Sequence, residues 1–188
     1  SFRYNIIGGL NPNELEDVYN KLALEIKETN KFNIELLKSI YVSDSDFEQS
    51  FSSKSFKRTT RNHKIVKYIF GSIERKIFTN DIPYDSDIYT IEHILPESPD
   101  ENWNQFSDEE INRSIFRIGN LTLLEKKLNR DIENSSYDIK KTAFLKSNSK
   151  ITQKLSREND SWTESKIISR QKELAKNAKS VWKIQLLE

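Results

Sequence analysis

Apolar residues recur along most of the chain at the spacing of an amphipathic helix. The stretch 11–28 starts with Asn11 as a candidate N-cap and Pro12 at the first helical position, a pair that is common at helix starts. The stretch 61–78 predicts a basic helix with one apolar stripe, because isoleucine recurs there at every fourth position. The two stripes comprise Leu15, Val18, Leu22 and Ile26, and then Ile65, Ile69, Ile73 and Ile77.

Shorter helical patterns fill much of the remaining sequence. Capping residues and helical spacing predict a short helix that starts at Ser45, one near 107–114, one within 135–147, and a long one from Thr163 to about Leu187. The chain is therefore expected to be mostly helical.

Two segments depart from the helical period. Residues 88–95, "IYTIEHIL", are rich in β-branched and aromatic side chains and stop at Pro96, which predicts a strand. Residues 117–124, "RIGNLTLL", predict a second strand that is entered through Gly119. A helical stripe then continues through Leu128 and Ile132. The pattern predicts an α+β domain in which a strand, a long loop, a strand and a helix are embedded among helices.

Composition narrows the class of protein. The 188 residues include no cysteine, which excludes disulfides, zinc knuckles and a thiol nucleophile. No apolar run approaches the roughly 20 residues that a membrane-spanning helix needs, so we expect a soluble, cytoplasmic protein. Methionine is absent even at position 1, and we therefore expect the chain to be part of a longer protein with further residues upstream.

Charge is strongly patterned although the total is only +1. Residues 54–76 carry eight lysines and arginines against one acid, and residues 126–188 carry fifteen against eight. Residues 81–111, which lie between these two basic blocks, carry ten acids and no lysine or arginine. Each block has an ordinary explanation as a solvated surface. Their order also suggests an acidic segment that holds a cation between basic segments that hold the phosphates of a polyanion.

The predicted strands and the helix after them carry the most informative polar residues. His93 can accept a proton from water near neutral pH, and phosphodiester hydrolysis needs such a base beside a cation. Glu92 and Asn129 offer oxygen ligands of the kind that Mg²⁺ prefers. Because successive strand residues point to opposite faces, Glu92 and His93 can share a site only where the strand twists or ends. Asn120 is better suited to bonding backbone and holding the histidine loop than to reacting.

Other conspicuous residues have simpler explanations. His63 lies in a basic helix with no matching set of acids and asparagines, so we interpret it as structural. The three tryptophans are expected to pack in or around the core, and Trp103 is a candidate cover for the histidine loop. Arg58, Arg61, Lys64 and Lys67 suit a phosphate track, although a solvated face explains them almost as well.

Three segments, "IEHILPES", "RIGNLTLLEKKLN" and "SSYDIKKTAF", together resemble the HNH nuclease domain at the C-terminus of GmrSD-type modification-dependent restriction enzymes. The resemblance is clearest from Tyr89 to Ser147. It implies that His93 is the general base and that Glu92 is the metal-binding acid. It also implies that Asn120 is the central asparagine, counted with the catalytic residues, and that Asn129 is the last metal ligand. Asn134 competes with Asn129 for that last role.

The resemblance also implies a fold and a context. We expect a ββα-metal motif within one C-terminal nuclease domain, with a helical lead-in over 1–80, the HNH core over 81–150 and a helical region over 151–188. DNA is the expected substrate, in restriction or anti-phage defence, and the expected cofactor is Mg²⁺, with Mn²⁺ or Ni²⁺ as alternatives. A ParB-like NTP-using sensor domain is expected upstream or in a partner chain. The expected DNA contacts are Arg58, Arg61, Lys64, Lys126 and Arg130.

Two other functions fit the same residues. The chain could be a nucleic-acid-binding module whose hairpin is purely structural, or a metal-dependent RNase that acts as a toxin. A DNA-nicking assay with and without Mg²⁺ separates the nuclease from the binding module, and an RNA substrate tests the third possibility.

Overall fold

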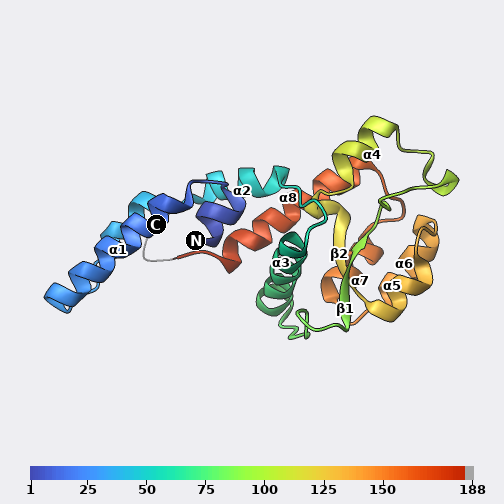
Figure 1. Cartoon of the computed structure of the whole chain (residues 1–188). Helices are drawn as coiled ribbons and strands as arrows, with labels where there is room; N and C mark the ends of the chain where they lie inside the picture. Colours follow the sequence, from blue (N-terminus) through green and yellow to red (C-terminus); the bar gives the residue numbers. More distant parts are fainter. Residues whose placement is uncertain (185–188) are drawn as a thin grey trace.

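The computed structural model describes residues 1–184 and shows a mostly helical chain around one antiparallel pair of strands (Figure 1). The α+β class predicted from the hydrophobic pattern is confirmed. In order, the α-helices and strands are α1 (Pro12–Thr29), α2 (Asp44–Ser53), α3 (Thr60–Phe78), β1 (Tyr89–His93), α4 (Asp108–Ser114), β2 (Leu121–Glu125), α5 (Lys126–Ile132), α6 (Tyr137–Leu145), α7 (Lys150–Glu158) and α8 (Glu164–Val181). The shorter helical turns are η1 (Phe2–Ile7), η2 (Ile34–Ile40), η3 (Glu101–Trp103) and η4 (Ile118–Asn120).

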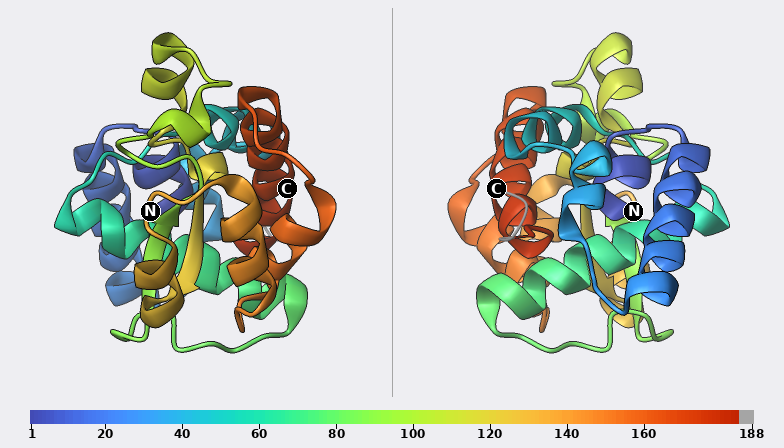
Figure 2. Two further views of the ribbon diagram at one scale, coloured as in Figure 1. Left: turned by 90° about the vertical axis from the view of Figure 1, so that its right-hand side faces the viewer. Right: turned by 90° about the vertical axis from the view of Figure 1, so that its left-hand side faces the viewer.

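The two strands form the centre of the region 89–147. β1 and β2 pair antiparallel in a register that places Glu92 opposite Thr122 and His93 opposite Leu121. α5 follows β2 directly and contacts both strands, and α3 and α7 also pack against the pair. The end-on views show the strands enclosed by these helices (Figure 2). The chain therefore places a strand, a long loop, a strand and a helix together, as the sequence pattern predicted.

Two buried apolar clusters flank the strands. The first includes Phe47, Phe70 and Leu123 and joins α2, α3 and α8 to the hairpin. The second includes Trp103 and Phe144 and joins the loop after β1 to α5, α6 and α7. Because β2 contributes Leu123 to one cluster and Leu124 to the other, burial on both faces fixes the register of the hairpin.

α8 braces the turn that leads into β2. The buried Arg170 donates Nη1 hydrogen bonds of 2.7 Å to the carbonyl oxygens of both Gly119 and Leu121. A Cβ atom at Gly119 would lie only 2.2 Å from the Ile167 carbonyl oxygen, so α8 can approach this closely only because residue 119 is glycine. The backbone that enters β2 is thus fixed by a helix from the far end of the sequence.

Several predicted boundaries were wrong. The cap of α2 is Ser43, whose side chain accepts from the Asp46 amide, and Ser45 lies within the helix. The first four residues of the predicted second strand, 117–120, are instead a helical turn and its cap, because β2 begins only at Leu121. α7 and the short helices η1 and η2 were not predicted at all. α8 ends at Val181, and the predicted end near Leu187 lies outside the described residues.

The apolar stripe of α3 is also shorter than predicted. Ile69 and Ile73 are fully buried, but Ile77 is 39% exposed. On α1 only Leu15 and Leu22 are buried, since that helix extends away from the hairpin and packs mainly against η2 (Figure 1). Among the described residues no helix is long and apolar enough to cross a bilayer.

Candidate active site

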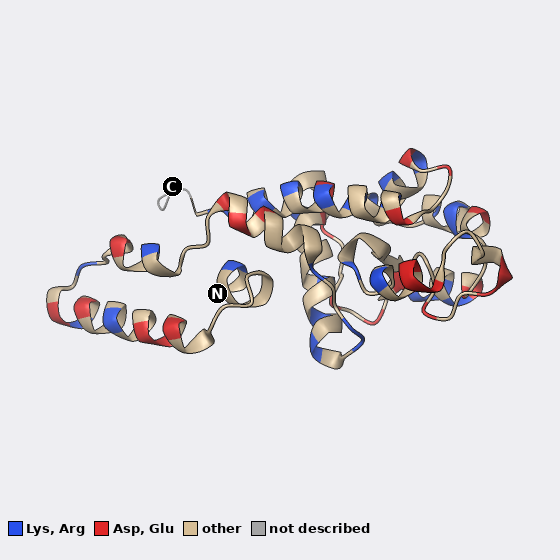
Figure 3. Cartoon of the chain, turned by 90° about the horizontal axis from the view of Figure 1, so that it is seen from above, with Lys and Arg blue, Asp and Glu red and all other residues tan. Residues whose placement is uncertain are grey.

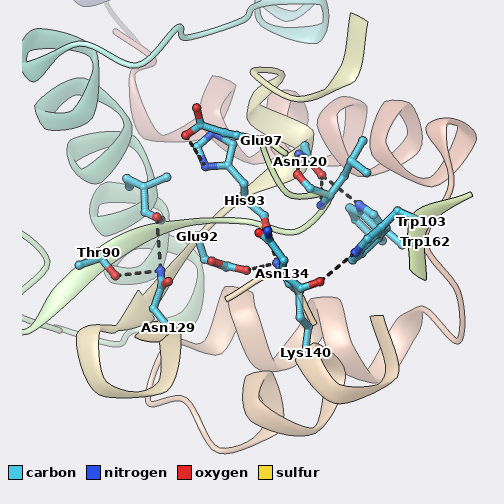
Figure 4. Close-up of polar contacts among 12 residues, drawn as sticks. Thr90, Glu92, His93, Glu97, Trp103, Asn120, Asn129, Asn134, Lys140 and Trp162 are labelled. Carbon is cyan, nitrogen blue, oxygen red and sulfur yellow. Dashed lines mark hydrogen bonds and ion pairs between the residues drawn. The ribbon is translucent and has the colours of Figure 1, made fainter. Parts of the chain in front are cut away.

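The end of β1 borders a cavity of about 580 Å³. Four parts of the chain line it: residues 56–66 before and within the start of α3, β1 with the loop that follows it, Leu121 at the start of β2, and residues 126–140 of α5 and α6. The titratable and amide side chains in its wall include His63, Glu92, His93, Glu97, Asn129, Glu133, Asn134 and Lys140, together with Lys57, Arg58, Lys126 and Arg130. Figure 4 shows His93 directed toward Glu97, Glu92 toward Lys140, and Asn129 toward Thr90.

His93 has the surroundings of a proton acceptor. Its side chain is 18% exposed, and Nδ1 lies 3.6 Å from Glu97 Oε1. Nε2 is buried and has no hydrogen-bond partner among the residues that the structure describes. Burial, together with the positive charges of Lys140 and Arg58, lowers the pKa of His93 to about 4. The imidazole is therefore neutral at pH 7. A proton on Nδ1, next to the Glu97 carboxylate, leaves Nε2 as the nitrogen of the ring that can accept a proton.

Glu92 is paired, not free. Its Oε1 accepts a hydrogen bond of 2.6 Å from Lys140 Nζ, which also donates to the His93 carbonyl oxygen at 2.8 Å (Figure 4). Both side chains are buried, with exposed fractions of 6% for Glu92 and 1% for Lys140. Burial raises the pKa of Glu92, and the neighbouring ammonium opposes that rise. The carboxylate thus already holds one cationic group, which belongs to α6.

Asn129 on α5 faces β1. Its Nδ2 donates to Thr90 Oγ1 at 3.0 Å and to the Ile91 carbonyl oxygen at 3.4 Å. The amide oxygen is the atom of Asn129 that can bind a cation. Asn134 also lines the cavity, but its Nδ2 donates to the Ser98 carbonyl oxygen and holds the loop after β1. Asn129 is therefore the asparagine that is bonded to the strand carrying Glu92.

Asn120 does not line the cavity. It is fully buried, and its Oδ1 accepts from the Leu95 amide at 2.8 Å and from Trp162 Nε1 at 3.0 Å. Its Nδ2 donates to the carbonyl oxygens of Leu95 and Ile115. These bonds tie the loop after His93 to the turn before β2. Any effect of Asn120 on the reaction would have to pass through this backbone.

The predicted DNA-contacting residues fall into two groups. Arg58, Lys126 and Arg130 line the cavity, and Arg58 Nη1 lies 3.6 Å from Glu97 Oε1. Arg61 and Lys64 are exposed on the first turns of α3 but are not part of the cavity wall. Lys67 is buried and donates to the Ser86 carbonyl oxygen at 2.9 Å, so it does not belong to an exposed phosphate track.

Three residues of the cavity had no role in the sequence interpretation. His63 of α3 lines the cavity, and burial lowers its pKa, with the positive charges of Lys67 and Arg58 contributing. Glu97 lies four residues after His93, a spacing that could have indicated it. Lys140 occupies a position in "SSYDIKKTAF" where Tyr137 and Phe144 mark the buried face of a helix. A lysine on a predicted buried face was therefore the missed indication.

The acidic block 81–111 does not form a metal-binding cluster. Of its acids only Glu92 and Glu97 line the cavity, where five lysines and arginines and three glutamates are present. Across residues 1–184, no group of three or more His, Cys, Asp or Glu side chains is placed to hold a metal ion. Acidic residues are instead spread over several elements (Figure 3). The cavity is cationic, which favours a phosphate-bearing ligand.

Most of the chain matches a known protein family. Residues 41–177 match the family model described as "GmrSD restriction endonucleases, C-terminal domain". The matched part includes the whole cavity wall and every side chain discussed above except those of η1, α1 and η2. A search of curated proteins found no match.

Proposed function

Since the chain belongs to the family of the C-terminal domain of GmrSD restriction endonucleases, we propose that it is a metal-dependent HNH endonuclease that hydrolyses DNA phosphodiester bonds. The observation that carries the proposal is His93 Nε2, which is buried in the wall of a cationic cavity without a hydrogen-bond partner among residues 1–184. A polar atom in that state is costly unless a ligand or water uses it.

In the proposed reaction, His93 Nε2 accepts a proton from the water that attacks phosphorus. Burial and neighbouring positive charge keep the imidazole neutral at pH 7, so no prior deprotonation is needed. Glu97 faces Nδ1 and favours the tautomer in which Nε2 is the acceptor. Arg58, Lys126 and Arg130 hold the phosphates on either side of the scissile bond.

The donor atoms near the strand end fit a hydrated divalent cation. Glu92 and Asn129 would hold it, through a carboxylate oxygen and an amide oxygen, which are hard ligands suited to Mg²⁺. Such an ion keeps most of its waters and needs only one or two protein ligands besides substrate phosphate. When bound, it supplies positive charge that stabilises the phosphorane and the leaving 3′ oxygen. Strands β1 and β2 followed by α5 then correspond to the ββα-metal arrangement.

The wider context is part of the same proposal. We infer that the chain acts in restriction or anti-phage defence and that a ParB-like NTP-using sensor, upstream or in a partner chain, selects the DNA. The cavity wall offers cations and amides but no recognition helix aimed at base edges, which agrees with a cleavage unit guided from elsewhere.

The test is supercoiled-plasmid cleavage with Mg²⁺, Mn²⁺ or Ni²⁺ and with excess chelator. Conversion to nicked or linear DNA that requires the metal supports the proposal. Tight DNA binding without cleavage under any metal would identify a binding module, and cleavage of RNA alone would identify an RNase. His63→Ala is the matched control for His93→Ala, because both histidines line the same cavity.

Asn129→Ala sharpens the ligand assignment. The loss of one of two protein ligands should raise the metal concentration for half-maximal cleavage by about tenfold or more. Asn134→Ala is its control, since that side chain bonds the loop at Ser98. If only Asn134→Ala raised the metal requirement, the last ligand would be Asn134.

A further inference from the structure

Glu92 is a candidate cation ligand in the cavity wall, but a lysine already neutralises part of its negative charge. Glu92 is the only carboxylate that β1 directs toward α6, and its Oε1 receives Lys140 Nζ at 2.6 Å. Lys57, Arg58, Lys126 and Arg130 add further positive charge to the wall, against Glu97 and Glu133. A divalent cation that enters this cavity alone would therefore meet an excess of positive charge.

Lys140 is held too firmly to be a surface contact. Its side chain is 1% exposed, its ammonium lies 5.8 Å from the Trp103 ring, and it bonds both Glu92 and the His93 carbonyl oxygen. Those two bonds fix the carboxylate and the backbone of the histidine beside it. One buried ammonium thus positions both residues that the proposed reaction uses.

We propose that Lys140 is a positioning residue that pins Glu92 and the end of β1 and makes binding of the divalent cation depend on a DNA phosphate. This inference rests on the proposed function. With Glu92 neutralised by Lys140, the chain alone attracts the cation weakly. A phosphodiester bound by the surrounding arginines and lysines restores the negative charge and supplies another oxygen ligand. Cation and DNA then bind cooperatively, and each raises the affinity for the other by the same factor.

The experiment measures Mn²⁺ binding directly, by electron paramagnetic resonance of the free ion, with and without a short DNA duplex. All proteins carry His93→Ala so that the duplex is not cleaved. In the chain with Lys140 intact, the duplex should tighten Mn²⁺ binding by about tenfold or more. Lys140→Met should tighten Mn²⁺ binding in the absence of DNA by about tenfold and reduce the effect of the duplex. A purely structural lysine would not improve metal binding when removed.

Lys126→Met is the matched control, because Lys126 lines the same cavity but is exposed and makes no bond to Glu92. Its effect on Mn²⁺ binding without DNA should be smaller, since solvent screens its charge. If the Lys140→Met variant folds but binds Mn²⁺ no more tightly than the chain with Lys140 intact, the inference is overturned.

If the Lys140→Met variant does not fold, Mn²⁺ binding by the chain with Lys140 intact still tests the coupling between cation and DNA. Equal Mn²⁺ affinity with and without duplex would overturn the inference. Plasmid cleavage by the chain with His93 intact is measured in parallel. Metal-dependent cleavage together with equal affinities would reject the coupling alone, whereas no cleavage and no Mn²⁺ binding would reject the nuclease proposal with it.

Discussion

The two sides of the end of β1 contrast sharply. On the side toward α6, Glu92 is buried and bonded to Lys140. On the other side, His93 lines the cavity, and its buried Nε2 has no hydrogen-bond partner among the described residues. Glu97 Oε1 lies at the longer distance of 3.6 Å from both His93 Nδ1 and Arg58 Nη1. Two successive residues of one strand therefore have opposite environments, one closed and paired and the other partly open and unpaired.

The contrast follows from elementary strand geometry. Neighbouring side chains point to opposite faces, so Glu92 and His93 cannot share a contact within a regular strand. The strand ends at His93, and both side chains then border the same cavity from different directions (Figure 4). The residues that fix the backbone at the strand end therefore differ from the residue proposed to react. The paired side fixes the backbone, and the unpaired side presents a base.

His93→Ala breaks the open side of this comparison and should have the largest effect. Removal of a general base typically lowers the rate by about two to four orders of magnitude. Folding and DNA binding should change little, since His93 Nε2 makes no bond within residues 1–184 and its charge is absent at pH 7. Single-turnover cleavage and thermal unfolding are the measurements. Cleavage at the unchanged rate would remove His93 from the mechanism.

Lys140→Ala breaks the paired side. It leaves Glu92 buried without its partner, and the free energy of unfolding should fall by about 3 kcal/mol. Denaturant unfolding at pH 7 measures this loss. The double variant Glu92→Gln/Lys140→Met should recover a large part of it, because no buried charge remains unpaired.

Lys141→Ala is the neighbouring control. Lys141 pairs with Asp160, whose side chain is 99% exposed, so its loss should change the free energy of unfolding by no more than about 0.5 kcal/mol. Equal effects for Lys140→Ala and Lys141→Ala would mean that the buried pair has no special weight in stability.

The sequence predicted the two sides unequally. The strand that ends near Pro96, the strand entered through Gly119 and the helix after it followed from local periodicity, and the placement of His93 at a strand end followed with them. The partner of Glu92 did not follow, because Lys140 lies 48 residues away and contacts it only through the packing of α6. A lysine in a charged stretch also has no local feature that distinguishes a buried ammonium from a surface one.

The same reasoning explains the missed helix α7. Glu74 on α3 is fully buried and accepts from Ser149 Oγ at 2.6 Å and from the Ile151 amide at 2.8 Å. The start of α7 is thus stabilised by a residue from a distant helix as well as by its own cap, Ser149. The acidic block 81–111 suggested a cluster of acids around a cation, but acids that are close in sequence need not lie close together in the fold. Only two of its acids reach the cavity.

Titration distinguishes the two sides further. The pKa of His93 is lowered from 6.5 to about 4, so between these values the unfolded chain binds a proton that the folded chain does not. The free energy of unfolding therefore rises with pH across this window, by about 3 kcal/mol, and the contribution is complete above pH 6.5. Glu92, whose pKa is raised, acts in the opposite direction. The difference between the native sequence and His93→Gln, measured in chelator, isolates the histidine. A pH-independent difference would contradict the buried, neutral imidazole.

The smallest expected effect is on DNA affinity, and it comes from basic residues at the start of α3 that lie outside the two sides compared above. Arg58, Arg61 and Lys64 lie at the start of α3, where Arg58 borders the cavity and the other two extend its basic surface. If each contacts one phosphate, replacing all three by alanine should reduce the slope of log affinity against log salt by about 0.9 per contact. Lys21, Lys27 and Lys31, which lie outside the matched residues 41–177, form a control of equal charge.

Binding is measured by fluorescence anisotropy with several unrelated duplexes over a range of salt. Similar affinities for all duplexes are expected, because cations that bind phosphates carry no base information. A strong preference for one duplex that persists at high salt would show that this chain reads sequence itself, and equal slopes for both triple variants would place the DNA path away from α3.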